Sequence, residues 1–138
     1  MDGHATSGIL FAFRELPDPR QKNHRHLLMD ILTIALLAVI CGADNQSAVA
    51  AYGRAKHQWL KTFLQLPNGI PSHDTFGRVF AKLNQRRVRV GHGAENFSRL
   101  CRIALNLLKN EPTHKNGIAI RRQNCGWDDG YLLKVLIG

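Results

Sequence analysis

The sequence predicts an all-α protein: a small helical bundle with a helix-turn-helix-like N-terminal domain, followed by a helical C-terminal tail. Several segments repeat apolar residues at steps of three and four, which is the period of an amphipathic helix. No segment shows the sustained alternation that is typical of a strand. The chain has 138 residues, 44% of them hydrophobic and 21% charged, which suits one domain or two very small ones.

The first helix is expected after a polar N-terminal arm. Residues 1–26 form this arm in our interpretation, because they hold two closely spaced prolines and a His/Arg cluster. The next segment, Leu27 to Cys41, is apolar on nearly all sides, which predicts a buried central helix with Gly42 as its C-terminal cap. A predicted N-terminal domain, residues 27–84, begins with this helix.

Two further helices are predicted in that domain. The first covers residues 45–66, with Asp44 as its N-cap and an apolar stripe along one face. A proline- and glycine-containing turn then ends it. The second covers residues 72–83, with Ser72 as its N-cap and four apolar residues on its buried face.

The second part of the chain is predicted to be a separate tail. Residues 85–93 are basic and flanked by glycine, so we interpret them as a junction, and residues 94–138 as the tail. The tail holds an amphipathic helix over 94–109 and a short last helix after Asp128, its expected N-cap. Residues 113–126 show no convincing period.

The apolar stripe of the 94–109 helix needs a partner. It is expected to pack on the N-terminal domain, to pack on a second copy, or to face water, with partial disorder after residue 84. The stripe consists of Phe97, Leu100, Leu107 and Leu108.

The charge favours a polyanionic partner. The net charge is +9 and the isoelectric point is near 10.1, so nucleic acid is the favoured partner and a membrane surface the weaker one. The longest apolar run, Ile31 to Cys41, is about half of the ~20 residues that a bilayer span requires. Three widely spaced cysteines and no visible secretory signal favour a cytoplasmic protein without a disulfide framework.

A helix-turn-helix would place the 72–83 helix in the major groove of DNA. Its first residues, His73, Asp74 and Thr75, would then meet base edges, with Arg78 and Lys82 positioned for phosphates. The alternative interpretation is a three-helix core with a solvated outer face, since the predicted turn is longer than the usual three or four residues.

Two other basic groups could neutralise backbone phosphates. One is the stripe Arg54, His57 and Lys61, and the other is the run Arg86, Arg87 and Arg89. Each taken singly also fits an ordinary solvated surface, whereas together they favour a basic partner surface.

No catalytic or metal site is predicted. His24 and His26 form the only close histidine pair, and no second cluster of ligands accompanies them. Asp128 and Asp129 are the only adjacent carboxylates, and neighbours in a helix point to different faces. No glycine-rich phosphate loop and no nucleophile motif is present, so we expect no cofactor and no metal.

Several ordered runs resemble the insertion-sequence transposases of the H-repeat-associated type, in the DDE superfamily. They are LPDPR at 16–20, DIL at 30–32 leading to CGAD at 41–44, YGRAK at 52–56 and, most specific, LPNGIPSHDTFGRVF at 66–80. The resemblance covers residues 11–84. It implies the N-terminal DDE-transposase-associated domain of that family, which is expected to be helical and to bind DNA.

The second half resembles the extreme C-terminal tail of the same family. The similar stretches are 89–96, 103–108, 126–129 and 131–133. The resemblance implies that the catalytic core between the two ends is missing, so no residue of the family's catalytic triad can be assigned. The chain is interpreted as an internally deleted, non-catalytic transposase remnant that binds DNA, either transposon ends or duplex without specificity. The alternatives are a helical interaction module that binds itself or full-length transposase, and a non-functional relic.

Overall fold

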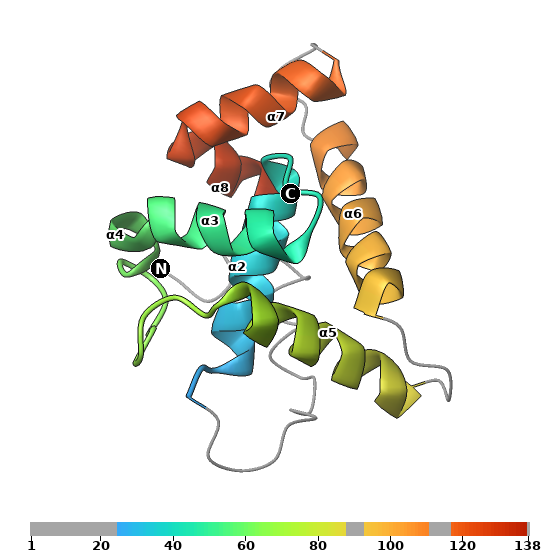
Figure 1. Cartoon of the computed structure of the whole chain (residues 1–138). Helices are drawn as coiled ribbons and strands as arrows, with labels where there is room; N and C mark the ends of the chain where they lie inside the picture. Colours follow the sequence, from blue (N-terminus) through green and yellow to red (C-terminus); the bar gives the residue numbers. More distant parts are fainter. Residues whose placement is uncertain (1–24, 88–92, 111–116, 138) are drawn as a thin grey trace.

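The computed structural model describes residues 25–87, 93–110 and 117–137. Those residues form helices and no strand, which confirms the predicted all-α class. Figure 1 shows the other helices arranged around α2. The helices are α2 (Leu28–Ile40), α3 (Gln46–Ala55), α4 (His57–Leu60), α5 (His73–Arg87), α6 (Gly93–Asn110), α7 (Ile118–Trp127) and α8 (Asp129–Ile137).

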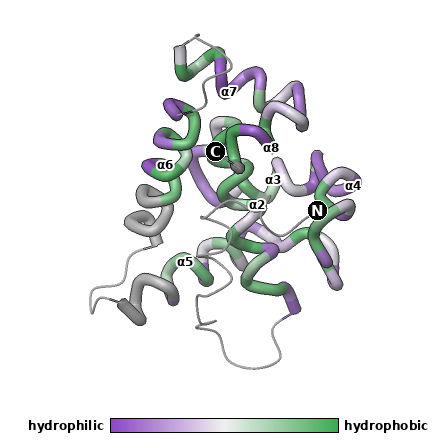
Figure 2. The backbone as a smooth tube through the Cα atoms, turned by 180° about the vertical axis from the view of Figure 1, so that it is seen from behind, coloured by the Kyte–Doolittle hydropathy of each residue, from purple (hydrophilic) through white to green (hydrophobic). Residues whose placement is uncertain are grey.

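The central helix α2 is buried along almost its whole length, as its sequence predicts. It packs against α3, α6 and α8, so apolar residues are needed on every side. Figure 2 shows the same pattern, with apolar stretches toward the middle and polar stretches on the peripheral α4 and α7. Gly42 follows the helix with φ +114°, a left-handed conformation that glycine adopts without steric cost. The predicted cap is therefore confirmed.

The helix predicted over residues 45–66 is shorter and broken. Its N-cap is Asn45, whose side chain accepts a hydrogen bond from the Ala48 N–H at 2.9 Å, so the prediction of Asp44 was wrong by one residue. Helix α3 ends at Ala55, and Lys56 lies between it and the single turn of α4. The apolar stripe continues across this break, which is why periodicity alone did not show it.

A buried carboxylate holds the loop that leads to α5. Asp30, only 3% exposed, accepts a hydrogen bond from the Leu66 N–H at 2.9 Å. Leu66 has φ +44°, a left-handed conformation that costs a residue with a side chain on the order of 1 kcal/mol. The Asp30 hydrogen bond and the burial of the Leu66 side chain offset that strain. The loop, and with it the start of α5, is therefore fixed against α2.

Helix α5 is capped as predicted but is longer than predicted. Ser72 Oγ accepts a hydrogen bond from the Thr75 N–H at 3.4 Å. The helix continues to Arg87, so residues 85–87 of the predicted junction are helical. Helices α3 and α5 pack against each other, but residues 56–72 separate them. This connection contains α4 and is much longer than the turn of a helix-turn-helix.

The C-terminal helices belong to the same core as the N-terminal ones. Helix α6 packs on α2 and α5, and α8 packs on α2 as well. Leu100 and Leu108 of the predicted stripe are buried and Leu107 is half-buried, whereas the Phe97 side chain lies outside the described part. The described residues of the stripe thus pack on the N-terminal helices, which is one of the three outcomes expected for it.

One tail helix, α7, was not predicted. Its ten residues include two arginines, a glutamine and an asparagine, so no apolar period is visible. Only Cys125 among them is buried. Asp128 then caps α8 as predicted, because its Oδ1 accepts hydrogen bonds from the Gly130 and Tyr131 N–H groups at 2.9 and 3.2 Å.

A half-buried ion pair joins the tail to the N-terminal helices. Lys56 Nζ lies 2.9 Å from Asp129 Oδ1 and 3.4 Å from the Gly126 carbonyl oxygen. These contacts connect the α3–α4 break with the end of α7 and the start of α8. None of the described helices is long and apolar enough to span a membrane.

Asp30 makes stability depend on pH in a predictable direction. Burial raises the pKa of the Asp30 carboxyl above its ordinary value of 3.8, although the Leu66 and Gln65 N–H groups and His26 act in the opposite direction. The folded chain therefore keeps this proton to a higher pH than the unfolded chain. The stabilising contribution is fully present below pH 3.8 and is lost as the pH rises through the raised folded pKa.

The variant Asp30→Asn cannot titrate and still offers an oxygen to the Leu66 N–H. We subtract the free energy of unfolding of the variant from that of the original chain. We expect this difference to decrease as the pH rises above 3.8. Urea unfolding of both proteins between about pH 3.5 and pH 7 measures this difference, and other titrating groups cancel in it. A difference that is constant, or that increases with pH, would contradict the assignment.

Candidate nucleic-acid interface

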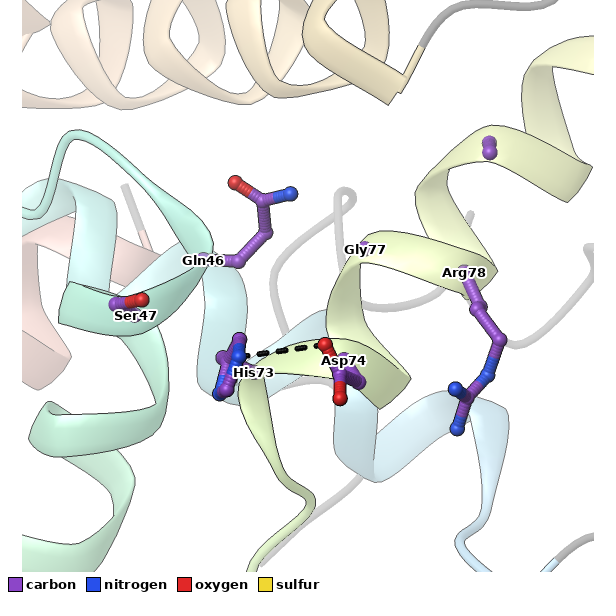
Figure 3. Close-up of a pocket in the computed structure, with 7 residues that line it drawn as sticks. Gln46, Ser47, His73, Asp74, Gly77 and Arg78 are labelled. Atoms are coloured by element: carbon purple, nitrogen blue, oxygen red, sulfur yellow. Dashed lines mark ion pairs between the residues drawn. The ribbon is translucent and has the colours of Figure 1, made fainter.

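The starts of α3 and α5 meet at an open pocket of about 390 Å³. Figure 3 shows the first turn of α3 facing the first turns of α5 across it. The first two residues of each helix line the pocket, so the backbone N–H groups at both helix starts lie near it. The pocket is lined by Gln46, Ser47, His73, Asp74, Gly77, Arg78 and Ala81.

The polar groups at the start of α5 are partly used within the protein. His73 Nε2 lies 3.2 Å from Asp74 Oδ1, and both side chains are mostly exposed, so the pair adds little stability. The Thr75 hydroxyl lies 3.3 Å from Ser72 Oγ and is half-buried at the cap. His73 and Asp74 thus remain accessible to a ligand, while the Thr75 hydroxyl already has a partner.

The basic residues predicted on α5 lie on its outer side. Arg78 is exposed and Lys82 is half-buried, one turn further along the helix. In Figure 3 the Arg78 side chain extends away from the His73–Asp74 pair. Since α5 continues to Arg87, position 86 follows 78 and 82 at the four-residue spacing of one helix face.

The other predicted basic residues are not all brought to this place. Position 87 is the last of α5, and position 89 lies outside the described residues. Arg54 is exposed in the last turn of α3, about 12 Å along the helix axis from Gln46 at 1.5 Å per residue. Lys61 is exposed just after α4. The structure therefore separates Arg54 and Lys61 from the pocket.

Two polar pocket residues were missed by the sequence interpretation. Gln46 and Ser47 are exposed polar residues in the first turn of α3. Their only signal was a polar run at a helix start, which is typical of any helix N-terminus. The Gln46 side chain lies over Gly77, where an added Cβ would be 3.0 Å from Gln46 Nε2. Gly77 thus leaves space for the end of the Gln46 side chain.

The carboxylates of the described region mostly have structural roles. Asp30 holds the loop before α5, Asp128 caps α8, and Asp129 pairs with Lys56. Within residues 25–87, 93–110 and 117–137 no three His, Cys, Asp or Glu side chains gather as a metal site would require. No disulfide joins Cys41, Cys101 and Cys125, and burial raises the pKa of Cys41 to about 11.

Comparison with known families identifies the larger part of the chain. The family described as DDE_Tnp_1-associated matches residues 10–93. The chain belongs to this family. The match includes all residues that line the pocket and all of α5, so the pocket is a feature of a DDE_Tnp_1-associated domain.

Individual relatives agree with this assignment. An uncharacterised protein in the dhlA 3′ region of Xanthobacter autotrophicus is 57% identical over 74 residues, which are 52% of this chain and 25% of that protein. The putative transposase YncI of Escherichia coli O157:H7 is 39% identical over 70 residues, 50% of this chain and 18% of YncI. The inactive transposase YbfQ of Escherichia coli K12 is 39% identical over 67 residues, 48% of this chain and 80% of YbfQ.

The chain is therefore a relative of transposases that shares one region with them. It spans a quarter or less of the length of the Xanthobacter protein and of YncI. No solved structure matches the fold.

Proposed function

We propose that this chain is a non-catalytic, transposase-derived protein that binds duplex DNA through α5. The observation that carries the proposal is that the exposed Arg78 and the half-buried Lys82 lie one turn apart on the helix that also carries the accessible His73–Asp74 pair. The net charge of +9 and the family relationship to transposases support the same partner.

In this proposal the groups divide between phosphates and bases. Arg78, Lys82 and the backbone N–H groups at the pocket contact phosphate oxygens, which sets affinity and orientation. His73 donates to base acceptors, and the Asp74 carboxylate accepts from the amino group of cytosine in the major groove. Thr75 contributes through its methyl group, since its hydroxyl is held at the cap. Position 86 extends the phosphate contacts along the helix.

The non-catalytic part of the proposal rests on the roles of the carboxylates. Asp30 accepts a hydrogen bond from the loop before α5, Asp128 caps α8, and Asp129 pairs with Lys56. These three carboxylates thus stabilise the fold. The family match accounts for residues 10–93 and leaves the tail outside it. We interpret this arrangement as an internal deletion that joined two ends of a transposase. The proposed partners are the transposon ends, duplex DNA and full-length transposase. The proposed location is the cytoplasm.

The alternative, an interaction module built on the 94–109 helix, receives less support. The side chains that would form its interface, Leu100 and Leu108, are buried against the chain's own helices. A second copy would have to displace that packing.

Charge removal on α5 tests the proposal. The double variant Arg78→Gln/Lys82→Gln should weaken binding to every duplex and reduce the slope of log K against log[salt] by about 0.9 for each phosphate that is no longer neutralised. Fluorescence anisotropy over a salt series measures both quantities. The matched control is Arg102→Gln/Lys109→Gln, which removes the same charge from exposed positions on α6. Equal reductions in the two variants would show that only net charge matters and would contradict the α5 site.

A further inference from the structure

Two large aromatic side chains are exposed to solvent in the described part of the chain. Trp127 is 80% exposed at the end of α7, and Phe63 is 43% exposed just after α4. Phe63 also contacts Trp59 edge to face, with ring centroids 5.0 Å apart. Phe63 thus has a half-buried aromatic neighbour, while 43% of its own surface stays exposed.

The fold brings the end of α7, which carries Trp127, close to the segment that precedes α4 and Phe63. The Gly126 carbonyl, one residue before Trp127, lies 3.4 Å from Lys56 Nζ. Lys56 immediately precedes α4. Figures 1 and 2, which view the molecule from opposite sides, both show the end of α7 near α4. Segments more than sixty positions apart in the sequence therefore lie close together, since the end of α7 contacts Lys56.

The segments around α4 also carry exposed positive charge. Arg54 and Lys61, the predicted phosphate contacts that do not reach the pocket, are exposed, and they lie two residues before Lys56 and directly after α4, respectively. The nearby carboxylates of the tail already have partners within the chain, since Asp129 pairs with Lys56 at 2.9 Å and Asp128 caps α8. We call Arg54, Lys61, Phe63 and Trp127 the α4–α7 surface.

We propose that the α4–α7 surface binds single-stranded nucleic acid. Unpaired bases stack on Trp127 and Phe63, and Arg54 and Lys61 contact the adjoining phosphates. Exposed aromatic rings beside cations are the combination that binds single strands with little sequence preference, because every base has a face to stack. A base-paired duplex offers no such face along its length. The proposal rests on the nucleic-acid binding proposed above, and it gives Arg54 and Lys61 a site separate from α5.

Replacement of Trp127 tests this directly. The variant Trp127→Leu should lower the affinity of the full chain for a short labelled oligothymidylate by about fivefold or more, as removal of one stacked base does. Trp127→Phe, which keeps a ring, should retain most of the affinity. Ile120→Ala is the matched control, because Ile120 is 48% exposed on the same helix and has no ring. Duplex binding should be unchanged in all three variants.

The outcomes separate this site from the α5 site. Duplex binding without oligothymidylate binding, or equal oligothymidylate affinity of the original chain and Trp127→Leu, would overturn the α4–α7 surface alone. Absence of binding to both nucleic acids in the original chain would overturn both proposals. Self-association that Trp127→Leu abolishes, measured by sedimentation without nucleic acid, would show a protein contact and also overturn the proposal.

Discussion

Replacing Leu108 with alanine is expected to lower the free energy of unfolding by about 2–5 kcal/mol, the usual cost of a large-to-small change in a tightly packed core. Leu108 lies in the tail but is fully buried, with 0% of its surface exposed. Its helix α6 packs on α2 and α5. Leu108 belongs to one core cluster with residues of α2, α3, α5 and α8, so the change leaves a cavity in that shared core and should destabilise the whole chain.

Urea unfolding followed by circular dichroism and by tryptophan fluorescence measures this effect. Both signals should shift together, because one cooperative unit unfolds. Leu105→Ala is the matched control: Leu105 is half-buried on the same helix, so we expect a decrease below about 1 kcal/mol. Equal, small decreases for both variants would mean that the tail does not share the core.

The second large effect is expected at Gly53. A Cβ at this buried position of α3 would lie 2.7 Å from Ile70 Cγ2 and 3.4 Å from Ile34 Cγ2. Ile70 belongs to the loop that Asp30 holds before α5. Gly53→Ala should therefore displace that loop and cost about 1–3 kcal/mol, even though alanine favours the helix itself.

Gly77→Ala provides the comparison, because it makes the same change in α5. There the nearest atom is Gln46 Nε2 at 3.0 Å, the end of a flexible and exposed side chain, so the variant should be neutral or slightly more stable. The clash at Gly53 can also be isolated: Ile70→Ala removes the methyl group that Cβ would meet. Gly53→Ala should cost less in the Ile70→Ala background, as a double-mutant cycle measures. Simple additivity would contradict the proposed contact.

The sequence predicted the helices that have a clear apolar pattern. It did not predict helix α7 or the helix that covers α6, because both depend on contacts between distant segments. Helix α2 was evident because it is apolar on all sides, and α8 because Asp128 marks its start. Helix α7 buries only Cys125, so no apolar period marks it, and its position depends on packing against α6 and α8. An amphipathic pattern in α6 predicted a buried face but not the helix α2 that covers it.

The candidate site was predictable only in part for the same reason. His73, Arg78 and Lys82 lie on one helix, so their relation follows from sequence spacing. The contribution of Gln46 and Ser47 arises only when α3 packs on α5. Arg54 and Lys61 were expected to extend the same basic surface, but the length of α3 and the turn of α4 place them away from it. Nothing local in the sequence connects them with Trp127.

The central claim, sequence-dependent binding of duplex DNA through α5, is tested most directly by fluorescence anisotropy of the intact chain on two duplexes over a salt series. One duplex carries the terminal inverted repeat of a related insertion element, and the other carries the same bases in scrambled order. We expect tighter binding to the repeat that persists as salt rises, since base contacts depend less on counterion release than phosphate contacts do. Equal affinity for both duplexes that disappears as salt rises would contradict the claim, because only the net charge of +9 would then account for binding.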